Sequence, residues 1–464
     1  MGNGRSRSVR TTTPDATVVG PGRHRVVVIG SGFGGYFAAR HLRRRLRSAD
    51  VTVTMLSSSD GLVYSPLLPD VAAGSLEPRS IVVPTAERTA EFAVVRGHAS
   101  AVDLDAKTVS YAALDGSTQQ LGYDRLLLCP GSVTRLLDIP GLAERAIGLK
   151  TVAEAMYVRD HVLGRLESAN SMTDPHERRA ALTFLVVGAG YAGTELAAQM
   201  ARLTAELLPR YPNLHRDEVH WLLVDVASAV MPELGSALGE AALALLRRRD
   251  VDVRLGVSVK AIEKHRVELT DGTTLDCATV VWCAGVTASP LIGDLGLPTE
   301  RGRLRVDEYL RVPGHPSVYA LGDAAAVPDL TKPMGDDGTR PICPPTAQHA
   351  MRQATAAARN IAADLGCGSQ RPYRHRDLGL VVDLGGPDAA ATPVGLRLKG
   401  RPAKLVARGY HLFALPTLNR RLRVAIDWAF AAAGPADDVA LGLLSLEDAL
   451  AADAEHGIRS TRSS

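Results

Sequence analysis

Two glycine-rich turns hold the residues of this chain that are best suited to chemistry. The first turn consists of Gly30, Ser31, Gly32, Phe33, Gly34 and Gly35, and the second has Gly188, Gly190 and Gly193 at its first, third and sixth positions. Each turn follows an apolar, β-branched run and precedes a helical pattern, which is the setting in which GxGxxG binds the pyrophosphate of a dinucleotide. The sequence therefore predicts two dinucleotide sites.

The two predicted sites differ at the end of their second strands. The run 51–56 is followed by Ser57, with Asp60 three residues later, whereas the run 221–225 ends at Asp225. A carboxylate at this place accepts hydrogen bonds from the ribose and repels a 2′-phosphate. We therefore expect the second turn to prefer NADH to NADPH. The ribose at the first turn should be held more weakly, or through Asp60 or water.

The elements that position these turns need more than one domain. A chain of 464 residues is too long for one ordinary core and indicates two or three domains. The first glycines of the two turns are 158 residues apart (188 minus 30), which leaves room for one domain to be inserted in another.

Composition and charge exclude several other classes of protein. The net charge of +3, from 53 basic and 50 acidic residues, gives no reason to expect nucleic acid as a partner. The five cysteines are odd in number and form no close pair, so neither a disulfide framework nor a metal site is expected, and a reducing cytosol fits best. Residues 1–24 are interpreted as a flexible leader, and no apolar run is long enough to predict a spanning helix.

Seven motifs in order give the chain a family resemblance. They are VYSPLLPDVAAGSLEP (63–78), YDRLLLCPGSVT (123–134), IPGLAERAIGLKTVAEA (139–155), the second glycine motif ending in Glu195, VWCAGVTASPLI (281–292), VYALGDAA (318–325) and PPTAQHAMRQ (344–353). Over residues 25–435 the chain resembles the type II NADH:quinone oxidoreductases. These are single-chain flavoproteins that do not pump protons, and they belong to the two-dinucleotide-domain group that includes glutathione reductase.

This resemblance implies the fold and the cofactors. The fold would be α/β, with two Rossmann-like domains of the glutathione-reductase type. FAD would bind at the first turn and NADH at the second. The implied parts are a leader (1–24), an FAD domain (25–150 and 313–380) with the NADH domain (151–312) inserted in it, and a C-terminal α/β region associated with the membrane (381–464).

The resemblance also assigns residues, position by position. Gly322 and Asp323 match the second FAD signature, and Gly131 matches the crossover between the domains. Ala284 and Gly285 match a turn beside the bound NADH. Glu195 matches a glutamate near the nicotinamide and flavin rings, and Ala347 and Gln348 match a pair in which the glutamine borders the flavin and the quinone pocket. Glu195 and Gln348 are the expected catalytic residues.

Departures from the family pattern keep alternatives open. The usual glutamine pair appears as Arg352-Gln353, which leaves the identity and even the use of quinone open, and His349 is interpreted as structural rather than as a proton donor. A sulfide:quinone oxidoreductase could use Cys129 and Cys343 near the flavin, and a soluble NADH reductase could use another acceptor. The preferred hypothesis is an NADH dehydrogenase that reduces a membrane quinone, with menaquinone expected.

The stretch 396–430 predicts where such an enzyme would work. It interleaves apolar and aromatic residues with eight arginines and lysines, a pattern typical of a helix in the headgroup layer, and Pro416 divides it in two. We expect a peripheral enzyme on the cytoplasmic side of the cell membrane. The same charges would suit a solvated rim around a domain or dimer interface, so a homodimer stays open. The acidic tail carries one predicted helix over 443–454.

Overall fold

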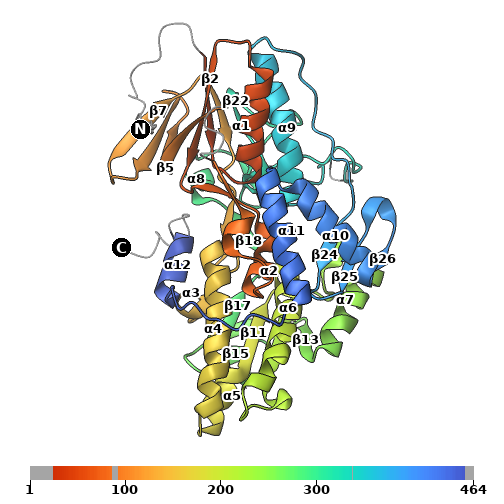
Figure 1. Ribbon diagram of the computed structural model, residues 1–464. Helices are drawn as coiled ribbons and strands as arrows, with labels where there is room; N and C mark the ends of the chain where they lie inside the picture. The colour runs from red at the N-terminus through yellow and green to blue at the C-terminus, as the bar shows by residue number, and fades with distance from the viewer. Residues whose placement is uncertain (1–23, 86–91, 337, 455–464) are drawn as a thin grey trace, which may run out of the picture.

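The computed structural model describes residues 24–85, 92–336 and 338–454, and the predicted leader lies outside this range except for His24. Two sheets, one above the other in Figure 1, form the body of the molecule. The predicted α/β class is confirmed. No helix among the described residues combines the length and the apolar character needed to cross a membrane.

The larger sheet has eight strands. Its order is β21-β22-β8-β1-β2-β5-β6-β7, and the central pairs from β22 to β5 are parallel. The strands are β1 (His24–Ile29), β2 (Val51–Ser57), β5 (Ala93–Asp103), β6 (Thr108–Ala113), β7 (Thr118–Gly122), β8 (Arg125–Leu128), β21 (Arg311–Val312) and β22 (His315–Ala320). Four consecutive buried residues end β1, which is what a parallel strand covered on both faces requires.

The smaller main sheet has five parallel strands in the order β10-β17-β11-β12-β13. They are β10 (Ala146–Ile147), β11 (Thr183–Val187), β12 (His220–Asp225), β13 (Val251–Leu255) and β17 (Thr279–Trp282). A two-stranded antiparallel ribbon pairs β9 (Ser132–Thr134) with β18 (Val286–Ala288). Along the chain, each of its strands follows a strand of one main sheet and precedes a strand of the other.

Short strands form the remaining sheets. They are β3 (Gly61–Val63) with β4 (Val82–Pro84); β14 (Val259–Ile262), β15 (Arg266–Leu269) and β16 (Thr274–Asp276); β19 (Thr299–Glu300), β20 (Arg303–Arg305) and β23 (Ala325–Ala326); and β24 (Val381–Asp383), β25 (Ala389–Ala391) and β26 (Leu398–Lys399).

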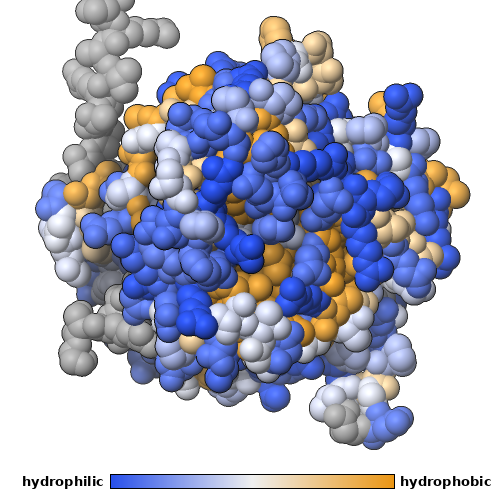
Figure 2. Space-filling view, turned by 90° about the horizontal axis from the view of Figure 1, so that it is seen from below, coloured by the Kyte–Doolittle hydropathy of each residue, from blue (hydrophilic) through white to orange (hydrophobic). Residues whose placement is uncertain are grey.

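Helices cover both sheets. They are α1 (Phe33–Arg45), α2 (Leu68–Ala72), α3 (Leu142–Arg145), α4 (Val152–Ser171), α5 (Pro175–Leu182), α6 (Tyr191–Leu207), α7 (Ser236–Arg248), α8 (Pro290–Gly293), α9 (Ala347–Asp364), α10 (Gly400–Ala414), α11 (Leu418–Ala433) and α12 (Leu446–Ala454). Helices α1 and α9 lie side by side on the upper sheet, and α10 and α11 run across the front (Figure 1). Seen from below, the surface is mostly hydrophilic, and apolar residues show in a recess near the middle (Figure 2).

Candidate dinucleotide and redox site

The first glycine turn is shaped by close backbone contacts. Gly30 has a φ of +99°, and a Cβ there would lie 2.2 Å from the carbonyl oxygen of Cys129. A Cβ on Gly35 would lie 1.8 Å from the carbonyl oxygen of Gly30, so helix α1 packs directly on the turn. A Cβ on Gly32 would meet no atom within 4 Å. The turn is therefore closed on the protein side and open on the outer side.

The second turn repeats this geometry. Gly188 has a φ of +109°, and a Cβ on Gly193 would lie 2.0 Å from the carbonyl oxygen of Gly188. Gly190, like Gly32, faces space that is open to at least 4 Å. Both helices begin at these open glycines, and no side chain caps the N-terminus of either α1 or α6. The uncapped N–H groups are suited to phosphate oxygens, so the residues present fit a dinucleotide at each turn.

The predicted selectivity residue of the second turn is held in place. Asp225, at the end of β12, accepts hydrogen bonds from the backbone N–H of Ala189 at 2.5 Å and from that of Ala227 at 2.7 Å. The first bond ties the carboxylate to the glycine turn itself. Asp225 thus stands where β12 meets the turn, as the sequence predicted.

Three serines occupy the equivalent place at the first turn. Ser57 Oγ lies 2.6 Å from Ser31 Oγ, which lies 3.0 Å from Ser59 Oγ. The carboxylate of Asp60 is largely exposed and pairs with Arg96. The first turn therefore presents neutral hydroxyls where the second presents a carboxylate. Sequence analysis missed Ser59.

The ribbon between the sheets brings several predicted residues together. Gly131 (φ +76°) precedes β9, and its carbonyl oxygen accepts from the N–H of Ser289, which follows β18. Ser132, on β9, donates from Oγ to Asp323 Oδ2 at 2.6 Å. Gly322 is fixed by a 2.8 Å bond from its N–H to the buried Gln353 side chain. Gly131 and Asp323 thus lie at one junction.

The predicted residues Ala284 and Gly285 follow β17 at the same ribbon. A Cβ on Gly188 would lie 2.9 Å from the amide nitrogen of Ala284, which places Ala284 against the second glycine turn. Gly285 has a φ of +85°, and its carbonyl oxygen accepts from the N–H of Arg135 just after β9. The ribbon therefore links the second turn to the segment that holds Asp323.

Glu195 lies in a buried network of charged groups. Its Oε1 accepts from the backbone N–H of Asp383 at 2.7 Å, and the Asp383 carboxylate pairs with Lys404. Asp70 joins through bonds from Gln199 at 3.4 Å and from Trp428 at 3.1 Å. Burial raises the pKa of Glu195 well above its usual value, and burial raises the pKa of Asp70 to about 6. Sequence analysis assigned no role in a site to Asp70, Asp383 or Lys404, although Asp70 lies in the motif 63–78 and Lys404 in the basic stretch 396–430.

Helix α9 positions the other predicted catalytic residue. Ala347 is its first residue, and Thr346 caps the helix by accepting from the N–H of His349. Gln348 donates to the carbonyl oxygen of Gly379 at 3.2 Å and accepts from Arg352 at 3.2 Å. Arg352 also donates to the carbonyl oxygen of Arg376. The unusual arginine is thus bound to neighbouring protein groups.

His349 packs among neighbouring side chains of the protein. It is buried, its Nδ1 lies 3.1 Å from the hydroxyl of Tyr373, and its ring stacks on His375 with centroids 3.8 Å apart. Burial lowers the pKa of His349 to about 4, which favours the neutral ring.

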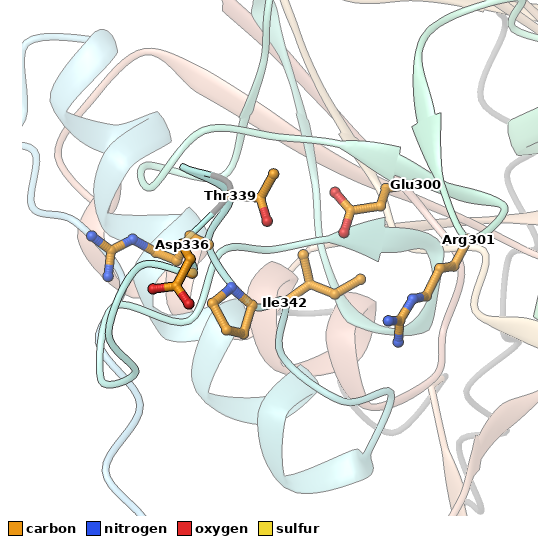
Figure 3. A pocket seen from close by; sticks show the side chains of 8 residues that line it. Glu300, Arg301, Asp336, Thr339 and Ile342 are labelled. Atoms are coloured by element: carbon orange, nitrogen blue, oxygen red, sulfur yellow. The ribbon is translucent and has the colours of Figure 1, made fainter.

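Two hollows lie outside the glycine turns. A cavity of about 1370 Å³ is bordered by α2, α4, α6, α10 and α11, and Asp70, Gln199 and Lys404 of the buried network line it. A hollow of about 560 Å³ lies between the β19–β20 hairpin and residues 335–336 and 339–342 (Figure 3). The side chains of Glu300, Arg301 and Asp336 border the smaller hollow, which shares no residue with the predicted site.

Comparison with known proteins identifies the class to which this fold and its two glycine turns belong. Residues 24–359 match the family model described as pyridine nucleotide-disulphide oxidoreductase, so the chain belongs to this family. A solved structure described as NDH2 from Plasmodium falciparum in complex with NADH has the same fold, with a TM-score of 0.82 at 18% identity over 90% of this chain and all of that one.

Curated relatives narrow the class. The chain is 33% identical to type II NADH:quinone oxidoreductase NdhA of Mycobacterium tuberculosis over 89% of this chain and 88% of the relative. It is 31% identical to type II NADH:quinone oxidoreductase Ndh of the same organism, over 89% of each chain. Within its class, the chain therefore belongs to the type II NADH:quinone oxidoreductases, and the predicted family is confirmed.

Proposed function

We propose that this protein transfers a hydride from NADH to bound FAD and two electrons onward to a membrane quinone, without pumping protons. The observation that carries the proposal is the pair of open glycine turns on two sheets that meet at the β9–β18 ribbon. A hydride passes directly between donor and acceptor, so two dinucleotide sites must face each other. Family membership supports the same reaction.

The binding residues divide between the two turns. For FAD they are Gly30, Ser31, Gly32, Phe33, Gly34, Gly35, Ser57, Gly131, Gly322, Asp323, Ala347 and Gln348. For NADH they are Gly188, Gly190, Gly193, Asp225, Ala284 and Gly285. The proposed FAD domain (25–150 and 313–380) contains six of the eight strands of the larger sheet in full, and β1 except for His24. The edge strand β21 lies within the bounds of the proposed NADH domain (151–312), and β10, within the bounds of the FAD domain, pairs in the smaller sheet.

When bound, FAD supplies the redox chemistry as hydride acceptor for NADH and two-electron donor for quinone. The chain's own residues bind and orient. The turn at 188–193 and Asp225 would hold NADH, and Gln348 would border the flavin ring and the quinone. Glu195 accepts from Asp383 at Oε1, so its proton would sit on Oε2, and burial favours that protonated form.

Helices α10 and α11 support a position at the cytoplasmic side of the cell membrane. Six of their apolar side chains are exposed: Leu405, Phe413, Leu418, Leu422, Ile426 and Phe430. Basic residues such as Arg401 and Arg423 are exposed beside them. Apolar side chains flanked by cations suit the headgroup layer of an anionic membrane, from which menaquinone would enter. Homodimer formation through this C-terminal region (381–464) would compete with such binding.

The sulfide-oxidising alternative is weaker. It needs thiolates, but Cys129 and Cys343 are both buried, and burial raises the pKa of each thiol, that of Cys343 to about 12. NADH bound at the second turn is therefore a better-supported electron donor than sulfide.

Anaerobic stopped-flow absorbance at the oxidised-flavin band tests the proposal. The holoprotein is mixed with NADH, NADPH or sulfide, and then with a soluble menaquinone analogue. Bleaching by NADH in preference to NADPH and sulfide, reversed by the quinone, supports it. Absence of bleaching by NADH contradicts the donor half, and bleached flavin that the quinone fails to reoxidise contradicts the acceptor half.

A further inference from the structure

Lys150 stands where the two sheets meet. It lies within the motif 139–155, and the family resemblance gave it no role of its own. It follows β10, the edge strand of the smaller sheet, by three residues. Its backbone N–H donates to Glu154 Oε2 at 2.7 Å, and Glu154 also closes a capping box with Thr151 at the start of α4. Glu154 is almost completely buried, so the backbone of Lys150 is fixed to a rigid helix end.

The Lys150 side chain is linked by hydrogen bonds to Asp323, which belongs to the proposed FAD site. Its Nζ donates to Ser132 Oγ at 3.0 Å, and Ser132 Oγ in turn donates to Asp323 Oδ2 at 2.6 Å. A serine hydroxyl has one proton and two lone pairs, so it can accept from the ammonium while it donates to the carboxylate. The three side chains form a directed chain from cation to anion across residues far apart in sequence.

The ammonium group has capacity left for a ligand. It carries three N–H donors, and among the described residues Ser132 is the one that accepts a hydrogen bond from it. Asp323 is the residue proposed to hold the FAD ribityl or pyrophosphate region. The chain therefore places a positive charge two hydrogen bonds from that region, on a segment that leads into the NADH domain.

We infer that Lys150 is a positioning residue of the flavin site, which orients Asp323 through Ser132 and favours reduced flavin by its positive charge. The inference rests on the proposed function. A hydride carries two electrons and one proton, so its transfer from NADH to FAD leaves NAD⁺ and a reduced flavin with one added negative charge. A nearby cation stabilises that charge and so raises the reduction potential.

The test compares Lys150→Met, Lys150→Arg and Ser132→Ala with the matched control Lys260→Met, which removes an exposed lysine on β14. Each holoprotein is measured for its flavin midpoint potential by anaerobic dye equilibration, for FAD retained after gel filtration, and for its melting temperature. We expect Lys150→Met to lower the stability of bound reduced flavin, relative to bound oxidised flavin, about tenfold. For a two-electron couple this corresponds to a midpoint potential about 30 mV lower. Lys150→Arg should restore most of this shift.

Ser132→Ala separates orientation from charge. It breaks the chain and keeps the ammonium, so it should lose FAD several-fold faster than wild type while its potential moves less than that of Lys150→Met. A purely structural tie would lower the melting temperature of Lys150→Met and leave the potential of the retained flavin at the wild-type value, which overturns the inference. A potential shift in Lys150→Met no larger than the shift in Lys260→Met would also overturn the inference.

Failure of the proposed function is visible separately. If wild-type flavin is not bleached by NADH, the donor half fails whatever the variants do. If wild type turns over NADH and quinone and Lys150→Met keeps the wild-type potential and FAD retention, only the role of Lys150 fails.

Discussion

The two glycine turns share a backbone and differ in the group at the end of the second strand. Gly30 and Gly188 both have φ values near +100°, and a Cβ on Gly32 or Gly190 would meet open space. Beside the first turn lie the hydroxyls of Ser57 and its neighbours, and beside the second lies the carboxylate of Asp225. The shared backbone geometry suits both turns to a pyrophosphate, and the residue at the end of the second strand determines how the ribose is bound.

The helices after the turns differ as well. At the position where α6 carries Glu195, α1 carries Phe37, counted from the first glycine of each turn. Glu195 lies in the buried network with Asp383 and Lys404. At this position α1 therefore carries an apolar side chain, whereas α6 carries an ionisable one.

The largest effect is expected from filling the open side of the second turn. In Gly190→Ala the new Cβ meets no protein atom within 4 Å, so stability should hold, while the methyl group occupies the pyrophosphate position. We expect NADH affinity to fall roughly 100-fold, about 2.7 kcal/mol. Calorimetric titration of the holoprotein measures this.

Gly193→Ala is the variant to compare with Gly190→Ala. Its Cβ would lie 2.0 Å from the carbonyl oxygen of Gly188, so this substitution should lower the melting temperature as well as NADH affinity. Gly32→Ala should act on FAD instead. Wild-type NADH affinity in Gly190→Ala would remove the second turn from the NADH site.

Asp225→Ser gives the second strand the ending of the first. Loss of hydrogen bonds to a charged acceptor costs about 1.5–3 kcal/mol, so the preference for NADH over NADPH should fall roughly 10- to 100-fold. The ratio of kcat/KM values for the two donors measures it. Asp252→Ser, at a half-exposed aspartate on β13, is the control. An unchanged ratio in Asp225→Ser would place selectivity elsewhere.

Glu195→Gln tests the difference between the helices through pH. Burial raises the pKa of Glu195 well above 4.5, so the folded protein binds a proton that the unfolded chain releases as pH rises past this value. Stability therefore falls with rising pH in that window, by up to about 1.4 kcal/mol per pH unit for one proton. Gln keeps the acceptor for Asp383 and cannot ionise, so the variant should lack this slope.

Urea unfolding of wild type and Glu195→Gln between pH 4.5 and 8 gives the two slopes. The difference in unfolding free energy, variant minus wild type, should grow with pH. Parallel curves would show that Glu195 titrates alike in the folded and unfolded states.

Ser57→Ala should give the smallest effect. It removes one neutral hydroxyl from the serine cluster, worth about 1 kcal/mol, so FAD should bind roughly five times more weakly. Fluorescence titration of the apoprotein with FAD measures the change. Ser58→Ala, next in the chain but exposed, is the control. Equal affinities for wild type and Ser57→Ala would mean that the first turn holds FAD without these hydroxyls.

Local patterns predicted most of the elements around the site. The apolar run before the first turn forms β1 (His24–Ile29), the basic stretch forms α10 and α11 on either side of Pro416, and the helix predicted over 443–454 begins at Leu446. Each signal lies within a few consecutive residues, so neighbours along the chain suffice to read it. The seven motifs likewise predicted the family, which comparison confirmed.

The sequence by itself determined the two turns, the α/β class and the family, because glycine spacing and apolar runs act through the local backbone. Only the tertiary structure decided which groups meet. Glu195 and Asp383 are 188 residues apart, and Ser132 and Asp323 are 191 apart. Such pairs depend on how the sheets, the ribbon and the C-terminal helices pack, and packing depends on the whole core rather than on any segment.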